Sequence, residues 1–352
     1  MKIGILTHHY VNNYGAFLQA WALREAVASL RPEDEVQIID YINIKHFLIN
    51  TGGWFRFYFR RETLQSWLQK TRVPGTFAAA RRELVLSKRC YSAEDINALK
   101  YDCIIVGSDE VWNYADWKSY LPLKFGKGLQ CEHLIAYAPS VGNSTLIRPM
   151  PEVAKEGICR FHSISARDEL TEKIVKELTR KTPARVLDST FLSEFPKAEQ
   201  PSRQKYLLFY YCDRLPKGMK RQILDYAKEH NMAVYGAGEC DKEFTDITVN
   251  LTPFEWVEMF RGAEHVFTGT FHGVVFSILN RRQFHVYLTK PSRIDKVRSL
   301  LAEFMINDRE MKEDFQYSDS LEAIDYDSVD RIIHSKREAS LEFLRTEIEG
   351  LE

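Results

Sequence analysis

The chain has 352 residues, of which 45% are hydrophobic and 28% are charged, and its formal net charge is -1. This composition excludes the disordered and collagen-like classes, and the near-zero charge gives no overall attraction to nucleic acid. The length exceeds one ordinary core and predicts two domains of roughly 150 residues with a cleft between them. Six scattered cysteines suit reduced thiols and do not have the spacing of a zinc or CxxC site.

The N-terminus runs directly into a strand-like stretch at 2–7 and lacks the features of a signal peptide. No apolar run is long enough to span a bilayer. We therefore expect a cytoplasmic protein, for which peripheral contact with the inner face of the membrane stays open.

The first half predicts alternating strands and helices, which is typical of a parallel α/β sheet. The strands are expected at 2–7, 35–41, 101–106, 133–138, 162–166 and 184–188, with a helix at 16–30. Ligands bind such sheets at the carboxyl ends of the strands, so the polar turns after these strands are candidate sites.

The turn after the first strand lacks the GxGxxG spacing of a dinucleotide site. A metal pair at His8 and His9 is not favoured, because adjacent residues of an extended chain point to opposite faces; we expect one in the core and one exposed. Asn12, Asn13 and Gly15 fit a sugar-binding turn, and turn structure alone would equally explain them.

Residues 44–92 form a basic aromatic insertion, with seven Trp, Phe or Tyr residues among nine Lys or Arg residues between 54 and 89. Such a mixture can bind nucleic acid, an anionic membrane or an acidic or lipid-linked glycan. A helical excursion with packed aromatics and solvated arginines explains it equally well.

Two strand ends in the first half carry charged residues. Asp109 follows the strand at 101–106 and is suited to a general base, with Gly107 giving a ligand room to approach; helix capping by Ser108 or Asp109 is the alternative. Arg167 lies where a helix begins, which disfavours a cation unless an anion shares the site. It is therefore a candidate anion ligand or an ion-pair partner of the acids that follow it.

The second half follows a linker at 195–204 and repeats the α/β pattern. Strands are expected at 206–212, 233–236, 264–268 and 283–288, and helices at 217–230, 253–262, 273–280, 297–305 and 326–348. The stretch TGTFHG at 268–273 joins a strand to a helix, where free N–H groups favour an anion. His272 in this stretch is a candidate ligand, or a capping or packing residue.

Seven stretches together resemble the polysaccharide pyruvyl transferase family. They are NYGA at 13–16 with LQA at 18–20, VGSDEVWN at 106–113, YAPSVG at 137–142, SARD at 165–168, LDST at 187–190, TGTFHG at 268–273 and REASLEFL at 337–344. They occur in the order of the family and cover nearly the whole chain.

The resemblance implies two Rossmann-like domains in a glycosyltransferase-B-like arrangement. It also implies transfer of pyruvate from phosphoenolpyruvate to a pair of sugar hydroxyls, forming a ketal on a surface polysaccharide or exopolysaccharide or its precursor. Arg167 and His272 match basic donor-binding residues of the family. The usual TDSFHG reads TGTFHG here, so Gly269 replaces an acid; we expect this acid to cap a helix, a role that Thr270 retains.

The resulting site hypothesis assigns His272 as acid and Asp109 as base. Phosphoenolpyruvate carries a phosphate and a carboxylate, so several cations are needed. The expected donor ligands are Arg167, His272, Thr270 and the basic loop residues Lys290, Arg293, Lys296 and Arg298. The expected acceptor ligands are Asn12, Asn13, Gly15, Ser108 and Trp112.

The predicted domains are 1–194 on the acceptor side, with the insertion at 44–92, and 205–325 on the donor side. A helix at 326–352 packs back across them. The partners are phosphoenolpyruvate and a glycan or lipid-linked oligosaccharide, with no metal, no tightly bound cofactor and no nucleic acid. Two rivals stay open, a nucleotide-sugar glycosyltransferase and a non-catalytic glycan-binding subunit.

Overall fold

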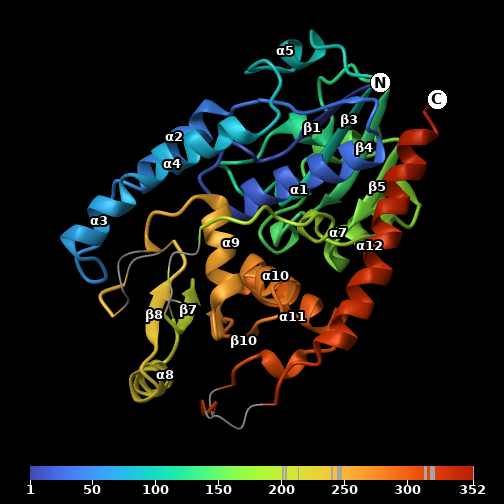
Figure 1. The fold of residues 1–352 in the computed structure, drawn as a ribbon. Coiled ribbons are helices and arrows are strands. Elements are labelled where there is room, and N and C mark those ends of the chain that lie inside the picture. The colour runs from blue at the N-terminus through green and yellow to red at the C-terminus, as the bar shows by residue number, and fades with distance from the viewer. Residues whose placement is uncertain are drawn as a thin grey trace. The chain divides into compact units, whose positions relative to one another are not determined.

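The computed structural model describes residues 1–199, 202, 204–212, 214–238, 241–243, 248–312, 315–317 and 322–351 (Figure 1). They form two compact units. The first comprises 1–52, 81–194 and 333–352, and the second comprises 53–80 and 195–332. Each unit contains its own parallel sheet, which confirms the α/β class with two Rossmann-like domains. Part of the predicted linker, at 200, 201 and 203, lies outside the described residues.

The sheet of the first unit has, in its described part, the order β2-β1-β3-β4-β5-β6. The strands are β1 (Lys2–Leu6), β2 (Glu35–Ile38), β3 (Cys103–Asp109), β4 (His133–Pro139), β5 (Ser163–Ala166) and β6 (Ala184–Arg185). The helices are α1 (Tyr14–Leu30), α2 (Ile44–Gly53), α5 (Ala93–Asn97), α6 (Glu152–Ile158) and α7 (Glu169–Thr179).

The apolar runs of β3 and β4 form the centre of this sheet. Residues such as Ile105, Val106, Ile135 and Ala136 are fully buried, as expected for strands covered on both faces. Helix α1 packs on β1, β2 and β3. It begins at Tyr14, two residues before the predicted start, because the side chain of Asn13 caps it.

The chain order places a topological switch point between β1 and β3. From β1 the sheet grows to β2 on one side, and the chain then returns to add β3 on the other side. Open α/β sheets bind ligands outside the carboxyl ends of their strands at such a point, so we expect a site at the loops after β1 and β3.

The sheet of the second unit has, among the described residues, the order β10-β9-β7-β8. The strands are β7 (Tyr206–Tyr210), β8 (Ala233–Gly236), β9 (His265–Thr268) and β10 (Gln283–Val286). The helices are α3 (Leu64–Lys70), α4 (Val73–Ala80), α8 (Lys217–Glu229), α9 (Pro253–Gly262), α10 (Phe271–Leu279) and α11 (Pro291–Glu303), and α12 (Tyr326–Glu349) begins here. By the same argument, the switch point lies between β7 and β9.

The basic segment at 290–298 is helical, so its assignment to a loop was wrong. Helix α11 begins at Pro291, with Lys290 as the N-cap residue. Proline fits the first turn of a helix because the N–H that it lacks would have no partner there. No helix in the described ranges is both long and apolar enough to cross a bilayer.

Candidate active site

Strand β3 ends in a carboxylate on a left-handed backbone. Asp109 has a φ of 79°, a conformation that is uncommon outside glycine and that clusters at functional sites. Its Oδ1 accepts a hydrogen bond from the N–H of Glu110 at 2.8 Å. Because its side chain is 20% exposed, Asp109 is oriented yet accessible, as a general base must be.

Gly107 is required by the close approach of β3 to β4. It has a φ of 132°, and a Cβ placed on it would lie 2.0 Å from the carbonyl oxygen of Tyr137. Only glycine allows β3 to approach β4 this closely, which is sufficient to explain Gly107; its role in giving a ligand room stays a prediction.

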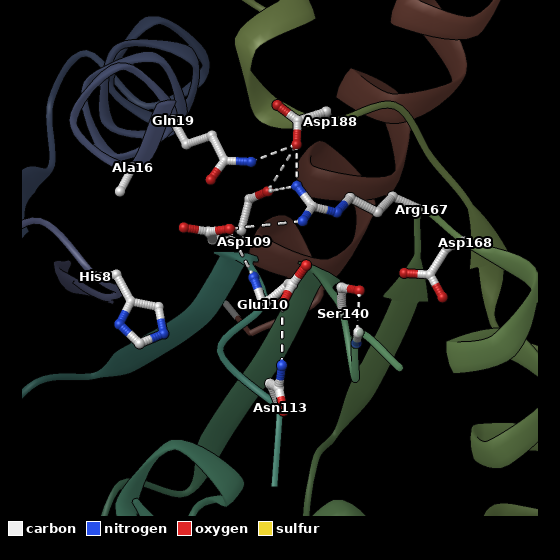
Figure 2. Close-up of polar contacts among 12 residues, drawn as sticks. His8, Ala16, Gln19, Asp109, Glu110, Asn113, Ser140, Arg167, Asp168 and Asp188 are labelled. Carbon is white, nitrogen blue, oxygen red and sulfur yellow. Dashed lines mark hydrogen bonds and ion pairs between the residues drawn. The ribbon is translucent and has the colours of Figure 1, made fainter. Parts of the chain in front are cut away.

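Arg167 follows β5 and pairs with two carboxylates (Figure 2). Its Nη2 lies 3.7 Å from Asp109 Oδ1, and its Nη1 pairs with Asp188 Oδ2. Burial opposes the charge of Arg167, but Asp188, Asp109 and nearby acids together raise its pKa above the ordinary value. The guanidinium is therefore a cation held at the carboxyl ends of β3 and β5.

Asp188 is the anchor of this arrangement. Its Oδ1 accepts bonds from the N–H and hydroxyl of Thr190 at 3.0 and 2.6 Å. Its Oδ2 accepts bonds from the amide of Gln19 and from the hydroxyl of Ser108. Buried charges need such partners, and here they fix the position of Arg167.

Sequence reasoning missed Asp188 and Gln19 as site residues. The available signal was a polar residue in an apolar setting, since Gln19 interrupts the apolar face of α1 and is fully buried. Both residues lie in stretches that carry the family resemblance, LDST and LQA.

A second buried cluster lies at the same edge of the sheet, after β1. Lys124 is fully buried, and its Nζ lies 2.8 Å from His8 Nδ1 and 3.1 Å from His8 Nε2. The hydroxyl of Tyr10 lies 3.0 Å from His46 Nδ1. None of these contacts was predicted from the sequence.

Burial controls the charge of this cluster. It lowers the pKa of Lys124 to about 7, against the opposing attraction of Asp109 and Asp116. Burial and the neighbouring Lys124 lower the pKa of His8 well below its usual range. The first unit thus contains one group, Lys124, whose pKa lies near neutral pH and which is electrostatically coupled to Asp109.

The expectation that one of His8 and His9 is exposed was wrong. His8 is 6% exposed and His9 is 0% exposed. The β1 loop turns inward, so His9 Nε2 contacts Asp40 Oδ1 at 3.1 Å while His8 contacts Lys124.

The proposed acceptor residues in the β1 loop have structural roles. Asn12 is buried, and its Oδ1 accepts bonds from both terminal nitrogens of Arg81, at 3.1 and 2.9 Å. Asn13 is exposed and caps α1, and Gly15 is buried within the first turn of that helix. Of these three, Asn13 alone presents a side chain to solvent.

The two proposed acceptor residues around Asp109 are buried. Ser108 is 0% exposed and bonds to Asp188. Trp112 is also 0% exposed; its indole donates to the carbonyl of Lys124 at 2.9 Å and stacks on Phe125. The ring of Trp112 belongs to the core, so it offers no face to a sugar.

The second unit carries the TGTFHG stretch at the end of β9. Thr270 caps α10, because its Oγ1 accepts the N–H of Gly273 at 3.0 Å. His272 is the second residue of α10 and is half-buried. The structure thus assigns His272 to a helix N-terminus, where a negative charge is favoured.

The basic residues of α11 differ in their surroundings. Arg298 forms a two-bond pair with Glu310, at 2.8 and 2.7 Å. Arg293 instead donates to the carbonyl of Gly269 at 3.2 Å and lies 6.0 Å from the ring centre of Tyr211. Lys290 and Lys296 are half-buried. Arg293 therefore contacts the TGTFHG stretch directly.

In the part of the chain that the structure describes, no group of three His, Cys, Asp or Glu side chains is arranged to hold a metal ion. The residues brought together are instead a cation, two carboxylates and a lysine–histidine pair, which are suited to acid–base chemistry and to binding an anion.

Solved structures similar to this chain include an epimerase and two glycosyltransferases. One is UDP-GlcNAc 2-epimerase from Neisseria meningitidis bound to UDP-GlcNAc, with 9% identity, a TM-score of 0.49, and coverage of 100% of this chain and 99% of that chain. Another is the glycosyltransferase SnogD from Streptomyces nogalater, with 10% identity, a TM-score of 0.48 and the same coverage. E. coli heptosyltransferase WaaC with ADP has 12% identity, a TM-score of 0.41, and coverage of 96% and 100%. Such low identities carry no information on the reaction.

No curated protein sequence matches the chain significantly. The family model for polysaccharide pyruvyl transferase matches residues 13–291, which include Asp109, Arg167, Asp188 and His272. The chain therefore belongs to the polysaccharide pyruvyl transferase family.

Proposed function

We propose that the protein transfers pyruvate from phosphoenolpyruvate to two hydroxyls of one sugar, forming a ketal on a polysaccharide or its precursor. The observation that carries this proposal is the 3.7 Å contact between Arg167 and Asp109 at the carboxyl edge of the first sheet. A cation for a donor anion and a base for an acceptor hydroxyl meet there. Family membership supports the same reaction class.

The reaction would run in two additions. A proton is delivered to the methylene carbon of phosphoenolpyruvate, and a sugar hydroxyl adds to the adjacent carbon as it loses its proton to Asp109. Phosphate then leaves, and a second hydroxyl adds to the same carbon as its proton passes to the departing phosphate. The products are the ketal and inorganic phosphate, so atoms and charge balance.

The proposed roles are divided among four residues. Asp109 accepts the hydroxyl proton, and Arg167 binds the donor carboxylate or phosphate. Asp188 is a positioning residue, since it holds Arg167. For His272 we propose donor binding and proton delivery, supported by its match to the family motif and by its place at the start of α10.

The test measures phosphate release from phosphoenolpyruvate with galactose-, mannose- and glucosamine-terminated acceptors, free and lipid-linked. We expect acceptor-dependent release that falls by on the order of 10²–10⁴ in Asp109→Asn, the range for losing a general base. His272→Gln and Arg167→Gln should lower it as well. The matched control is Arg221→Gln, which removes an exposed arginine paired with Asp225.

Stability is recorded for each variant, because Arg167→Gln leaves Asp188 buried without its cation. If that variant does not fold, Asp109→Asn alone decides, since Asp109 is partly exposed. Failure to bind phosphoenolpyruvate, or turnover of a sugar nucleotide in its absence, would overturn the proposal.

A further inference from the structure

The segment Phe55–Leu68 exposes an unusual concentration of apolar side chains. Six large hydrophobic residues here are between 48% and 67% exposed, whereas ten others are spread over the rest of the described chain. The six are Phe55, Phe57, Tyr58, Phe59, Leu64 and Leu68. Apolar patches of this kind on a folded surface mark binding sites.

Within residues 53–80, the exposed charges are all positive. Between residues 53 and 80 the chain has five cations and one acid, Glu62. Glu62 is buried and paired with Lys70, so the remaining charged side chains are four exposed arginines. They are Arg56, Arg60, Arg61 and Arg72.

An internal polar frame holds the segment in shape. Glu62 accepts the N–H of Tyr58 at 2.9 Å and also pairs with Lys70, whose Nζ donates to the carbonyl of Arg56. The indole of Trp67 donates to the carbonyl of Phe55 at 3.2 Å. Exposure of the apolar rings is therefore a property of a defined structure.

Apolar side chains are exposed both on the loop and on helix α3, which Figure 1 draws in light blue. Leu64 and Leu68 lie four residues apart on α3, so they share one face. Phe59 and Arg60 are adjacent, with the guanidinium 5.8 Å from the ring centre. Such a surface suits a lipid bilayer. The apolar side chains can insert among the acyl chains, and the arginines beside them can bind anionic headgroups.

We propose that the segment Phe55–Leu68 docks the protein on a membrane surface containing anionic phospholipid. A nucleic acid would match the arginines, but not the two exposed leucines on α3, which have no ring to stack on a base. Apolar insertion and charge attraction act together, and each arginine is worth roughly fivefold in affinity near such a surface. The proposal does not depend on pyruvyl transfer, because docking is measured without substrate.

The test uses the full chain and co-sedimentation with vesicles of phosphatidylcholine, alone or mixed with phosphatidylglycerol. We expect binding to the mixed vesicles that weakens in high salt. Phe55→Ser with Phe59→Ser should reduce the partition coefficient at least tenfold, and Arg60→Gln with Arg61→Gln should remove most of the preference for phosphatidylglycerol.

The matched control is Leu146→Ser with Ile147→Ser, which removes two equally exposed apolar side chains from the first unit. This control should bind the mixed vesicles as the wild type does. No binding to mixed vesicles, equal loss in the control, or stronger binding to a single-stranded oligonucleotide through the same residues would each overturn the proposal. Circular dichroism of every variant shows that the fold is retained.

Discussion

Two carboxylates contact one guanidinium, and their exposure separates their roles. The side chain of Asp188 is 1% exposed and that of Asp109 is 20% exposed. Asp188 is saturated by Gln19, Ser108, Thr190 and Arg167, so it is suited to holding the cation. Asp109 keeps an exposed surface, which its proposed role as a general base requires.

Lys124 is the residue whose burial has the clearest consequence for stability. Its pKa falls from 10.5 to about 7 in the folded chain because burial disfavours the ammonium. Between these values the unfolded chain holds the proton and the folded chain does not. Stability therefore rises with pH across this window, and below pH 7 the full cost of burying the charge is present.

Lys124→Met should remove this pH dependence. The free energy of unfolding of the wild type, minus that of the variant, should rise above pH 7 by up to about 1.4 kcal/mol per pH unit, the value for one proton. Denaturant unfolding between pH 7 and pH 9 measures it. His8 adds no slope there, because its lowered pKa affects stability below 6.5.

Lys127→Met, three residues away and exposed, is the control and should leave the dependence unchanged. The free energy of unfolding of the wild type, minus that of Lys124→Met, could instead stay constant or fall above pH 7. Lys124 would then be charged in the folded protein. The stability argument for this cluster would then fail.

At the scale of elements, α10 depends on two residues that precede it. Thr270 provides the cap, in agreement with the expected role. Gly269 stands where the family has an acid, and a Cβ there would lie 2.7 Å from the carbonyl oxygen of Tyr211 and 3.0 Å from that of Tyr287. The neighbouring backbones thus exclude the acid, and its loss is compensated by the cap.

Gly269→Asp should therefore destabilise the protein instead of restoring a family feature. The new side chain meets two carbonyl oxygens, and we expect a loss of roughly 1–3 kcal/mol, the usual cost of overpacking. Thr270→Ser should be nearly neutral, whereas Thr270→Ala should cost about 1 kcal/mol. Thermal unfolding measures the stability of the three variants. A Gly269→Asp protein as stable as the wild type would show that the strands can separate to admit the acid.

Local rules predicted the elements and part of the site. Asp109 and Arg167 could be found because strand ends and helix starts are visible in a single stretch of sequence. Lys124 and Asp188 could not be assigned, because their partners lie 116 and 21 residues away and only the folded sheet brings them together. Trp112 was misassigned for the same reason. An aromatic residue after a strand faces either solvent or the core, and residues elsewhere in the chain decide which. Here the ring stacks on Phe125 and its N–H donates to the carbonyl of Lys124.

At the scale of the whole molecule, each unit has its own sheet and its own core. One cluster of buried residues includes Val106, Trp112 and Leu134 from the first unit. Another includes Leu207, Phe209 and Phe267 from the second unit. Separate cores predict separate cooperative units, and α12 connects them covalently, since it begins in the second unit and ends in the first.

The C-terminal half of α12 completes the first unit. Ser340 accepts the backbone N–H of Leu187 at 2.9 Å, and Leu344 and Ile348 are fully buried. Leu344→Ala should therefore cost about 2–5 kcal/mol, as other buried leucine truncations do. Because Leu344 belongs to the first unit, we expect this cost to fall on that unit alone.

Hydrogen exchange by mass spectrometry measures where the cost falls. In Leu344→Ala, amides of β3 and β4 should exchange faster, while those of β7 and β9 should keep their wild-type rates. Thr346→Ala, an exposed position on the same helix, is the control and should change neither pair of strands. Equal acceleration of exchange in both sheets would show that the two units unfold together. Helix α12 would then belong to one cooperative core, and it would not specifically stabilise the unit that contains Asp109 and Arg167.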